Sequence, residues 1–502
     1  MLFGLSLLFS SLAVLFLQRL SAPRHFTKAF FADVFALFLG ASLYVFFVFL
    51  FKRPLLALVL TILFFLLLAI ITQAKQRALR NEALLFSDLT LLSQVLHFPK
   101  LYLPFLPWRQ MLAGLICFCP VLFCLWAFTP VYSLSSFWLL LFLPFILPLL
   151  AFWSPAAKRL LSSVFSSLSL CLSPKDAQII GPLATGVLQS IWHFCLRGVD
   201  SGIRGKANKP FAPLAFSEDL FTKVREKPEA LADLILIQEE SFCDPRRFTK
   251  ALPPDFFHYY DALANDGQSF ELDVHAYGAY TMRTEYEVLT GIEAKYLGTD
   301  AFHPYWSAQR FPSWSLAHFF KSLGYRTLCV HPFASSFFYR DKALPNLGFD
   351  AFLSLDTYSF SETYGPYVSD LAVAHTILTQ LSASEKPLFC FAITMENHGP
   401  WREGRLAKNE IAPYETLGFP VDVASYLVHL NHADAMLGVL ARGLSQRKQG
   451  ALLCVYGDHL PALPHFVSGN TFATPCLLWK NTGLQKKERG CITPASLGGV
   501  LL

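Results

Sequence analysis

Five long apolar segments fill most of the first 153 residues, and they constrain the fold more than any other feature of the chain. Each is long enough to cross the hydrocarbon core of a bilayer, which takes about 20 apolar residues in a helix. Only 15% of all residues are charged, against about 25% in an ordinary soluble domain. The sequence therefore predicts an N-terminal, all-α, polytopic membrane domain over residues 1–153. Its five expected transmembrane helices lie at residues 1–20, 29–51, 54–74, 110–129 and 132–153.

The basic residues between these segments bear on the orientation of the chain. Five spans place its two ends on opposite sides of the membrane. An outward C-terminal half would leave only Lys52 and Arg53 in an inner loop. It would place two clusters of basic residues outside: the first is Arg19, Arg24 and Lys28, and the second is Lys75, Arg77 and Arg80. This arrangement opposes the positive-inside rule. The loop charges taken alone therefore favour an inward C-terminal half.

Net charge and cysteine usage narrow the classes of function. A formal net charge of +5 is small for 502 residues, so we expect no nucleic-acid partner. The eleven cysteines include no CxxC pair and no Cys/His cluster with the spacing of a structural zinc site. Several lie in short apolar runs, where a free cysteine behaves as a small hydrophobic residue: Cys329, Cys390, Cys454 and Cys476.

Residues 154–228 are interpreted as a juxtamembrane linker. Lys158-Arg159 followed by LLSSVFSSLSL predicts an amphipathic helix at the membrane interface. The stretch SGIRGKANKPFAP predicts a loop from its Gly, Pro and basic content. The first apolar segment of the chain has no signal-peptide cleavage pattern after it, so we expect it to be retained.

From residue 229 to 502 short apolar runs alternate with helical patterns. Alternation of this kind, with almost continuously apolar strands, predicts an α/β domain with a parallel sheet covered on both faces. Two helices are expected, at 366–383 and 422–446. The expected strands lie at 232–238, 327–331, 387–394, 451–457 and 475–479.

Polar residues follow several of these strands at the same end. They include Glu240 after the first strand, His331 after the second, His398 after the third, and Asp458-His459 after the fourth. Ligands of parallel sheets collect beyond the carboxyl ends of the strands. Because the clusters converge at one edge, the sequence predicts a functional site there.

The residue types indicate a metal site. Glu240, Asp458 and His459 supply carboxylate oxygens and one imidazole, a mixture that suits a single Mn²⁺, with Zn²⁺ or Mg²⁺ as alternatives. The candidate nucleophile is Thr281 in YTMRTEY. A threonine hydroxyl is a poor nucleophile unless a metal or a base activates it. A divalent ion supplies that activation and also binds phosphoryl oxygens.

Five motifs, in this order and spacing, resemble the lipoteichoic acid synthase and phosphoglycerol transferase family. This family is in the sulfatase-like branch of the alkaline phosphatase superfamily. The resemblance covers about residues 230–480, and the five-span region before it is similar to that family's architecture. The motifs are ESF, TMRTEYEVLTG, HPFASSFFYRD, MENHGPW and YGDHLP. The sequence departs from the family pattern in two places: Phe338-Tyr339 replace a tryptophan, and LPAL follows Asp458-His459. Both departures bear on which group is transferred and to which acceptor.

The resemblance implies a role for each candidate residue. Glu240, Thr281, Asp458 and His459 would hold the metal, and Thr281 would become the covalent phosphoglycerol intermediate. Arg340 and His398 would contact the phosphate or glycerol, with His331 as a further substrate-binding candidate. Each of these residue types is present at the stated position of the sequence.

The resemblance also implies a substrate and a location. The donor would be phosphatidylglycerol, cleaved outside the bacterial cytoplasmic membrane to release diacylglycerol, and the acceptor would be a lipid or a glycan. This location outweighs the loop charges, so we expect the catalytic domain of residues 229–502 to be extracytoplasmic.

Alternative interpretations remain open. Phosphoethanolamine transfer uses a similar layout, although such enzymes tend to carry disulfides on the catalytic domain. Cys243-Asp244-Pro245-Arg246-Arg247 fits the C-x-P-x-R pattern of sulfatases, which would make Cys243 the nucleophile and the protein a sulfatase. If water resolves the phospho-threonine, the protein is a hydrolase. His429, His432 and Asp434 share a helix, but an i, i+3 histidine pair is more typical of a polar helix face. A membrane sensor or assembly protein with an inactive domain is the non-enzymatic alternative.

Overall fold

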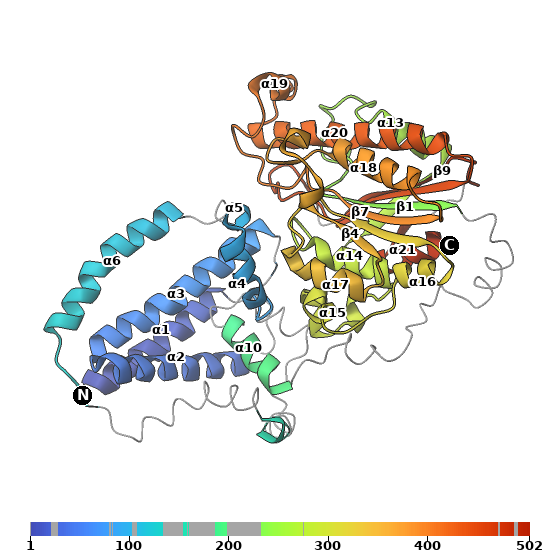
Figure 1. Ribbon diagram of the computed structural model, residues 1–502. Coiled ribbons are helices and arrows are strands. Elements are labelled where there is room, and N and C mark those ends of the chain that lie inside the picture. The colour runs from blue at the N-terminus through green and yellow to red at the C-terminus, as the bar shows by residue number, and fades with distance from the viewer. Residues whose placement is uncertain are drawn as a thin grey trace. The chain divides into compact units, whose positions relative to one another are not determined.

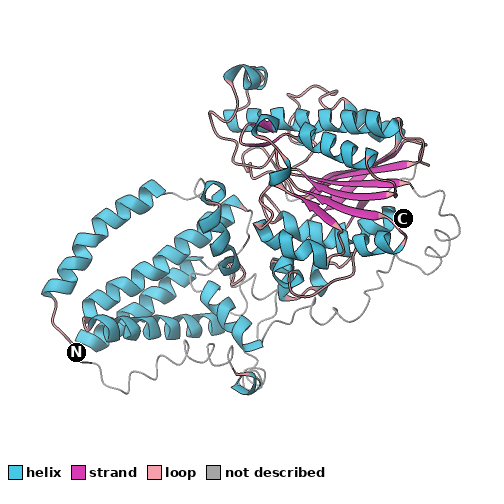
Figure 2. Cartoon of the chain, in the orientation of Figure 1, coloured by secondary structure: helices cyan, strands magenta, loops and turns pink. Residues whose placement is uncertain are grey.

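The structure is a computed structural model that describes residues 2–21, 29–79, 82, 84–102, 108–133, 154–157, 159, 186–197, 232–274, 276–469, 472–485 and 490–501. The chain divides into two compact units, Met1–Asp200 and Ser201–Leu502. The described part of the first unit is helical and that of the second is α/β (Figures 1 and 2).

Three long helices form the core of the N-terminal unit: α1 (Leu2–Ser21), α2 (Ala29–Phe51) and α3 (Pro54–Ala78). Small and apolar side chains such as Val48 and Ala57 are buried between them, whereas Phe9 and Phe16 of α1 are exposed. Outward-facing apolar side chains are what a helix in lipid presents, because lipid tails are as apolar as they are. This unit therefore has the surface of a membrane domain.

The number of spans differs from the prediction. Among the described residues three helices are long and apolar enough to cross a membrane, over Leu2–Leu20, Asp33–Phe51 and Pro54–Arg77. The fourth expected span corresponds to α6 (Trp108–Phe128), but its apolar part, Leu112–Phe128, is shorter than a full span. The fifth, at 132–153, lies outside the described residues apart from its first two, and so does the amphipathic helix after Lys158-Arg159. The remaining helices of this unit are α4 (Asp88–His97), α5 (Pro99–Tyr102) and α10 (Gly186–Arg197).

The C-terminal unit is built on a mixed sheet whose described strands follow the order β10-β2-β9-β8-β1-β7-β3-β4. The five strands from β8 to β4 are parallel to one another, which confirms the predicted parallel core. A separate hairpin joins β5 (Thr363–Tyr364) to β6 (Tyr367–Val368). The sheet strands are β1 (Asp233–Glu239), β2 (Gln268–Asp273), β3 (Arg326–Val330), β4 (Ala351–Leu353), β7 (Leu388–Ile393), β8 (Ala451–Gly457), β9 (Ala473–Lys480) and β10 (Cys491–Ile492).

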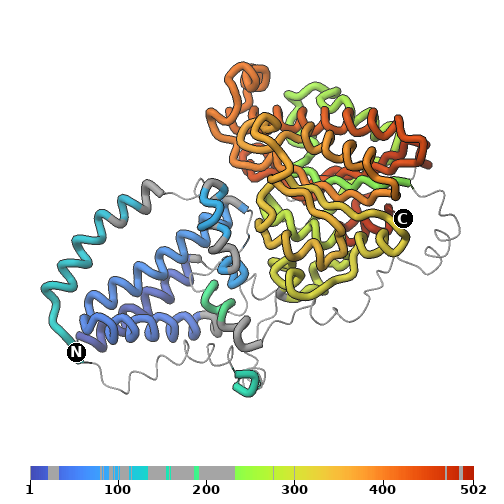
Figure 3. The backbone as a smooth tube through the Cα atoms, in the orientation of Figure 1, coloured from blue at the N-terminus to red at the C-terminus, as the bar shows by residue number. Residues whose placement is uncertain are grey.

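One side of the sheet departs from the all-parallel prediction. β9, expected from residues 475–479 as a parallel strand, runs antiparallel to both β8 and β2. Its side chains are buried almost throughout, so its apolar run does not reveal its direction. β2 was not predicted from the sequence, because its side chains alternate between buried and more exposed positions. The backbone trace in Figure 3 shows the last strands returning to this side of the sheet.

Helices cover both faces of the sheet (Figure 1). The predicted helices at 366–383 and 422–446 are confirmed as α18 (Asp370–Ser382) and α20 (Val421–Ser445). They pack on one face with α13 (Tyr259–Asp266), in a core where Leu430 of α20 joins Ile235 of β1. Four helices lie on the other face: α14 (Thr281–Thr290), α16 (Leu316–Ser322), α17 (Arg340–Asn346) and α21 (Pro494–Leu501). The short helices α15 (Pro304–Ala308) and α19 (Lys408–Thr416) complete the unit.

The register of the sheet decides where its strands end. Glu239 pairs with Gly457 across β1 and β8, and Gln238 pairs with Ile393 across β1 and β7. The residues that come after these strands therefore emerge side by side at one edge. β2 is antiparallel to β9, which is antiparallel to β8, so β2 ends at the same edge and leads the chain to Thr281.

Candidate active site

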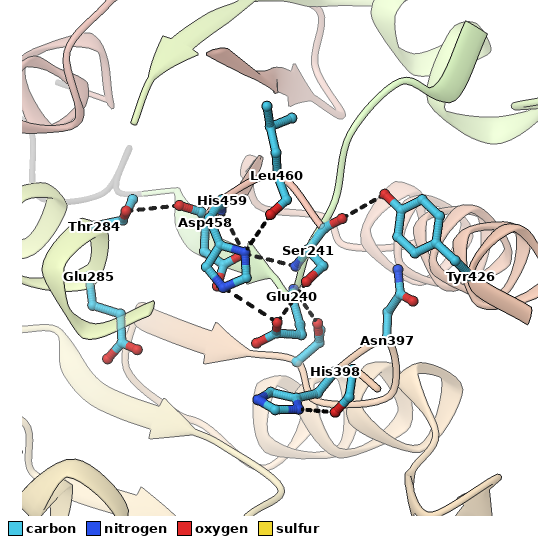
Figure 4. Close-up of polar contacts among 12 residues, drawn as sticks. Glu240, Ser241, Thr284, Glu285, Asn397, His398, Tyr426, Asp458, His459 and Leu460 are labelled. Atoms are coloured by element: carbon cyan, nitrogen blue, oxygen red, sulfur yellow. Dashed lines mark hydrogen bonds and ion pairs between the residues drawn. The ribbon is translucent and has the colours of Figure 1, made fainter. Parts of the chain in front are cut away.

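Three predicted metal ligands meet at this edge: Glu240 follows β1, and Asp458 and His459 follow β8 (Figure 4). Their donor atoms lie within 4.8 Å of one another. His459 Nε2 is 3.2 Å from Asp458 Oδ2 and 3.6 Å from Glu240 Oε1. Ligand atoms about 2.0–2.2 Å from a tetrahedral ion are roughly 3.3–3.6 Å apart. The spacing therefore suits one small divalent cation.

Hydrogen bonds around the three ligands turn their free lone pairs toward the centre of the group. His459 Nδ1 donates to the Leu460 carbonyl at 3.1 Å, which leaves Nε2 unprotonated in the neutral ring. Asp458 Oδ1 accepts from the backbone N–H groups of Ser241 and His459, each at 2.8 Å. Asp458 Oδ2 is buried and has no hydrogen-bond partner within the described part of the chain. An inward-facing oxygen of this kind is what a cation requires.

Electrostatics within the group also favour a cation. Burial raises the pKa of Glu240 to about 8, and the nearby Asp458 carboxylate adds to the effect. Burial likewise raises the pKa of Asp458, while His459 and the Thr281 hydroxyl act in the opposite direction. Two carboxylates that are desolvated side by side repel each other unless a positive charge lies between them. The donor set, its geometry and its charge all fit a divalent metal ion.

Thr281 lies at the start of α14, next to this group. Its side chain is only 7% exposed and is close enough to Asp458 to lower the pKa of that carboxyl. Thr284 Oγ1, one turn later, donates to the Asp458 carbonyl at 2.9 Å and ties α14 to the end of β8. The N-terminus of a helix also favours the negative charge of a phosphoryl group. The structure thus brings the predicted nucleophile to the predicted metal ligands.

The backbone around Thr281 has an unusual conformation. Tyr280 has a φ of 65°, in the left-handed region that residues other than glycine seldom adopt. Two residues earlier, Gly278 has a φ of +68°, and a Cβ added there would lie 2.7 Å from the Ala462 Cβ. The Gly278 N–H donates to the Leu460 carbonyl at 2.9 Å. This close approach holds the turn before Thr281 against the loop that carries His459.

Arg340 is buried and is held by two groups. Its guanidinium forms an ion pair with Glu285 of α14, and its Nη1 lies 3.2 Å from His331 Nε2. His331 Nδ1 donates to the Ile393 carbonyl at 3.1 Å, so Nε2 accepts from Arg340. Burial lowers the pKa of His331 well below its usual value, and Arg340 adds to this effect. These contacts use three of the five N–H donors of an arginine, and the other two have no partner among the described residues.

Both nitrogens of His331 are thus engaged within the protein. Its predicted contact with substrate stays a prediction, and the contact that the structure describes is with Arg340. Phe338 packs against the same guanidinium, with the Arg340 Cζ 5.4 Å from the ring centroid.

His398 lies on the loop after β7, close enough to Asp458 and Arg340 to sense their charges. Its Nδ1 is 2.7 Å from the Gly399 carbonyl, which can only accept, so the proton is on Nδ1. Burial lowers the pKa of His398 to about 4. The imidazole is therefore neutral near pH 7 and offers an unprotonated Nε2.

Residues of the alternative interpretations lie elsewhere. Cys243 is fully buried in the hydrophobic core, with its Sγ 3.0 Å from the Tyr426 hydroxyl, and burial raises the pKa of its thiol to about 12. Asp434 accepts from the backbone N–H groups of His258, Tyr259 and Tyr260 at the start of α13. His429 and His432 both contact Glu396. Within the described residues, Glu240, Asp458 and His459 form the one group with metal-binding geometry.

Two residues that complete the site were not predicted from the sequence. Glu285 stands in the motif TMRTEYEVLTG, and a carboxylate on an otherwise buried helix face is a signal that it has a buried partner. Ser241 stands in the motif ESF. Its hydroxyl donates to Glu240 Oε1 at 2.9 Å, and its backbone N–H donates to Asp458.

The sulfatase family model matches residues 232–498, which is more than half of the chain. The chain belongs to the sulfatase family. This confirms the sulfatase-like membership that the five motifs predict, and it confirms the predicted architecture of apolar N-terminal helices followed by an α/β sulfatase domain. Sulfatase-family membership supports an enzyme of the sulfatase-like class.

Two Rhizobium meliloti relatives of this sulfatase-family chain have names that refer to glycans. One, named for cyclic beta-1,2-glucan modification, is 30% identical over 321 residues, covering 58% of this chain and 49% of the relative. The other is the capsular polysaccharide biosynthesis protein RkpI, 29% identical over 440 residues, covering 82% of this chain and 75% of the relative. The chain thus spans about half the length of the first relative. Among solved structures, the Streptococcus pyogenes phosphoglycerol transferase GacH in complex with sn-glycerol-1-phosphate is similar at 22% identity and a TM-score of 0.45, covering 58% of this chain and 82% of that one.

Proposed function

We propose that this sulfatase-family chain is a membrane-bound, metal-dependent transferase that moves phosphoglycerol from phosphatidylglycerol to a lipid or glycan acceptor of the cell envelope. The observation that carries the proposal is the position of Thr281 at the start of α14, beside Asp458 of the metal-ligand group. Glycan names among the relatives favour a glycan as the acceptor. The motif resemblance favours phosphoglycerol as the transferred group.

The proposed reaction proceeds in two displacements. A divalent ion held by Glu240, Asp458 and His459, in our proposal Mn²⁺, supplies positive charge that lowers the pKa of a hydroxyl and neutralises phosphoryl oxygens. Thr281 Oγ1 attacks the phosphorus of the lipid, and the bond between phosphorus and the diacylglycerol oxygen breaks. An acceptor hydroxyl then attacks the phospho-threonine and restores Thr281. Arg340 balances the charge of the phosphoryl oxygens through the two N–H donors that Glu285 and His331 leave free.

His398 accounts for the proton in both displacements. Its resting tautomer has no proton on Nε2, so it first accepts the proton that the Thr281 hydroxyl gives up. It then donates this proton to the departing diacylglycerol oxygen. In the second displacement the same nitrogen takes the proton of the acceptor hydroxyl and returns one to Thr281 Oγ1. Proton transfer of this kind contributes about 10²–10⁴-fold to a rate.

The apolar helices α1, α2 and α3 suit a substrate that is itself a membrane lipid. We place the catalytic domain on the outer face of the bacterial cytoplasmic membrane, as the family resemblance implies. A cysteine-accessibility experiment with a membrane-impermeant reagent on intact cells tests this placement. A cysteine introduced at the exposed Glu403 should be labelled without breaking the cells, and protection until lysis would reverse the orientation.

The first experiment measures release of diacylglycerol from labelled phosphatidylglycerol by the full chain in detergent, with and without Mn²⁺. Thr281→Ala should lower release by at least about 10³-fold. Thr379→Ala, the same substitution at an exposed position on α18, should leave it unchanged. Release that survives in Thr281→Ala would overturn the assignment of the nucleophile.

The same assay with labelled phosphatidylethanolamine tests the second enzyme function, phosphoethanolamine transfer. The described cysteines are all free, so the disulfides typical of that class do not occur among them. Release from phosphatidylethanolamine alone would promote this function over the proposed one. If water rather than a glycan accepts the labelled phosphoryl group, the protein is a hydrolase.

A further inference from the structure

A single arginine clamps the loop that carries His398. Arg405 Nη1 donates to the His398 carbonyl at 2.6 Å and to the Pro400 carbonyl at 3.1 Å. Its Nη2 donates to the Glu396 carbonyl at 2.7 Å. One guanidinium therefore fixes three alternate carbonyls of the loop between residues 396 and 400, with His398 at its centre. Because a guanidinium is planar and rigid, these bonds set the orientation of the loop as well as its position.

The guanidinium is itself held from behind by His429 of α20. Arg405 Nε donates to His429 Nε2 at 2.9 Å, so the proton of this neutral ring is on Nδ1. His429 Nδ1 donates in turn to Glu396 Oε1 at 2.8 Å. Burial alone raises the pKa of Glu396, but hydrogen bonds from His429 and His432 outweigh it and hold the pKa below its usual value. Hydrogen bonds thus link the buried Glu396 carboxylate through His429 to Arg405, and Arg405 to the loop that carries His398.

A second contact leads from Arg405 to the His398 ring. The Arg405 Cζ lies 5.5 Å from the centroid of the Tyr367 ring, and the Tyr367 ring lies edge-on to the His398 ring with 5.8 Å between centroids. Burial lowers the pKa of Arg405 to about 10, so the guanidinium remains charged near neutral pH. Arg405 thus supports His398 through its backbone and through the ring that packs on it.

We propose that Arg405, oriented by His429 and Glu396, is a positioning residue that aims His398 Nε2 at the reacting oxygens. This inference rests on the proposed function, because it assigns Arg405 to the proton-transfer step and to no other step. Arg405 touches neither the metal ligands nor Thr281 in the described contacts. A misplaced His398 should therefore slow an ester whose leaving group needs a proton more than an ester whose leaving group needs none, because only the first also loses its proton donor.

Two phosphoglycerol diesters separate this role from a general role in stability. The diacylglycerol of phosphatidylglycerol leaves as an alkoxide that needs a proton, whereas the p-nitrophenolate of a p-nitrophenyl phosphoglycerol ester leaves without one. Arg405→Lys keeps the charge but cannot reach three carbonyls. It should lower release of diacylglycerol from phosphatidylglycerol by about 10–100-fold and lower the first release of p-nitrophenolate by at least about fivefold less, because only the lipid also loses its proton donor.

Arg402→Lys is the matched control, the same substitution at an exposed position three residues earlier in the chain, and it should change neither rate. Equal losses on both esters in Arg405→Lys would overturn the proposal, because a structural defect does not distinguish leaving groups. His398→Ala should reproduce the selectivity of Arg405→Lys, and the double variant should be no slower than His398→Ala alone.

Two His429 variants test whether His429 orients Arg405 through the hydrogen bond that its Nε2 accepts. The amide of Gln reaches the place of Nε2 and keeps an acceptor for Arg405, whereas the amide of Asn reaches only the place of Nδ1. His429→Asn should therefore lose more phosphatidylglycerol turnover than His429→Gln, and the opposite order would contradict the proposal. If His398→Ala slows both esters equally, the proton-transfer role in the proposed function fails. If His398→Ala is selective and the Arg405 variant is not, only the positioning inference fails.

Discussion

The Arg340 guanidinium and the Glu285 carboxylate form an ion pair that is almost wholly shielded from water, with side-chain exposures of 1% and 0%. Tyr305 adds a hydrogen bond from its hydroxyl to Glu285 Oε2 at 2.9 Å. Because Glu285 and Thr281 belong to the same short helix, the pair fixes Arg340, the proposed phosphate-binding residue, relative to Thr281, the proposed nucleophile. The Glu285 carboxylate thereby helps to set the position of Arg340 in the candidate site.

Loss of the Glu285 carboxylate should damage both stability and activity. Glu285→Gln leaves a buried guanidinium without its counter-charge, and breaking a buried pair in this way costs about 3–5 kcal/mol. We expect the melting temperature of the full chain in detergent to fall by roughly 5–10 °C and turnover to fall at least about tenfold. Glu287→Gln, two residues along the same helix, is the control and should not lower the melting temperature near pH 7. An unchanged melting temperature in Glu285→Gln would contradict the importance assigned to the pair.

Glu287 itself makes stability depend on pH. Burial raises the pKa of Glu287 to about 8 in the folded protein, against about 4.3 in an unfolded chain. The folded state therefore holds a proton that the unfolded state has lost, and this contribution to stability declines as pH rises from about 4.3 to about 8. The melting temperature of Glu287→Gln should thus rise relative to that of the unaltered chain as pH increases across this window. A difference that is independent of pH would mean that Glu287 is ionised in the folded state.

Removal of a metal ligand should be visible without any activity assay. His459→Ala takes away the imidazole and leaves Glu240 and Asp458 to repel each other. We expect metal analysis of the purified protein to give about one divalent ion per chain, with strong loss in His459→Ala. Chelation should lower the melting temperature of the unaltered chain by mass action, but not that of the variant. Equal metal content in the two proteins would exclude His459 as a ligand.

Cys243 should be dispensable for catalysis. Its sulfur is buried and hydrogen-bonds the Tyr426 hydroxyl, so Cys243→Ser keeps that contact and should retain phosphotransfer within about twofold. Destabilisation should stay near 1 kcal/mol, as for other small core changes. The folded protein should also resist thiol alkylation at this position, because its thiol pKa lies far above neutral and the thiolate is the reactive form. Rapid alkylation of Cys243 or loss of activity in Cys243→Ser would reopen the sulfatase alternative.

The sequence was sufficient to predict the residues that meet at the end of the parallel strands. Glu240, Asp458 and His459 each come directly after a strong apolar run, and parallel strands bring the residues beyond their carboxyl ends to one edge of the sheet. Thr281 follows none of the predicted strands, so it was a candidate nucleophile from its chemistry and from the motif resemblance. The strand that carries it there, β2, has alternating burial and gave no continuous apolar signal.

The contacts that aim the site could not be predicted in the same way. Arg340 and Glu285 are separated by 55 positions, and Arg405 and His429 by 24. No local pattern pairs such residues, because their proximity depends on how helices and loops pack on the finished sheet. The histidine pair on α20 illustrates this limit. Its spacing indicated only a polar helix face, whereas the structure shows His429 between Glu396 and Arg405.

The pairing of β2 with β9 has a consequence for biosynthesis. β2 leads directly to Thr281, yet the strands beside it, β9 and β10, are made some 200 residues later. During N-to-C-terminal synthesis the segment bearing the nucleophile has no neighbour in the sheet until these last strands are present. Such distant pairings form late in folding, since the loop between them must be closed first. In a nascent chain Glu240, the proposed metal ligand after β1, would thus be made long before Thr281 is anchored, and the proposed site would be complete only with the final strands.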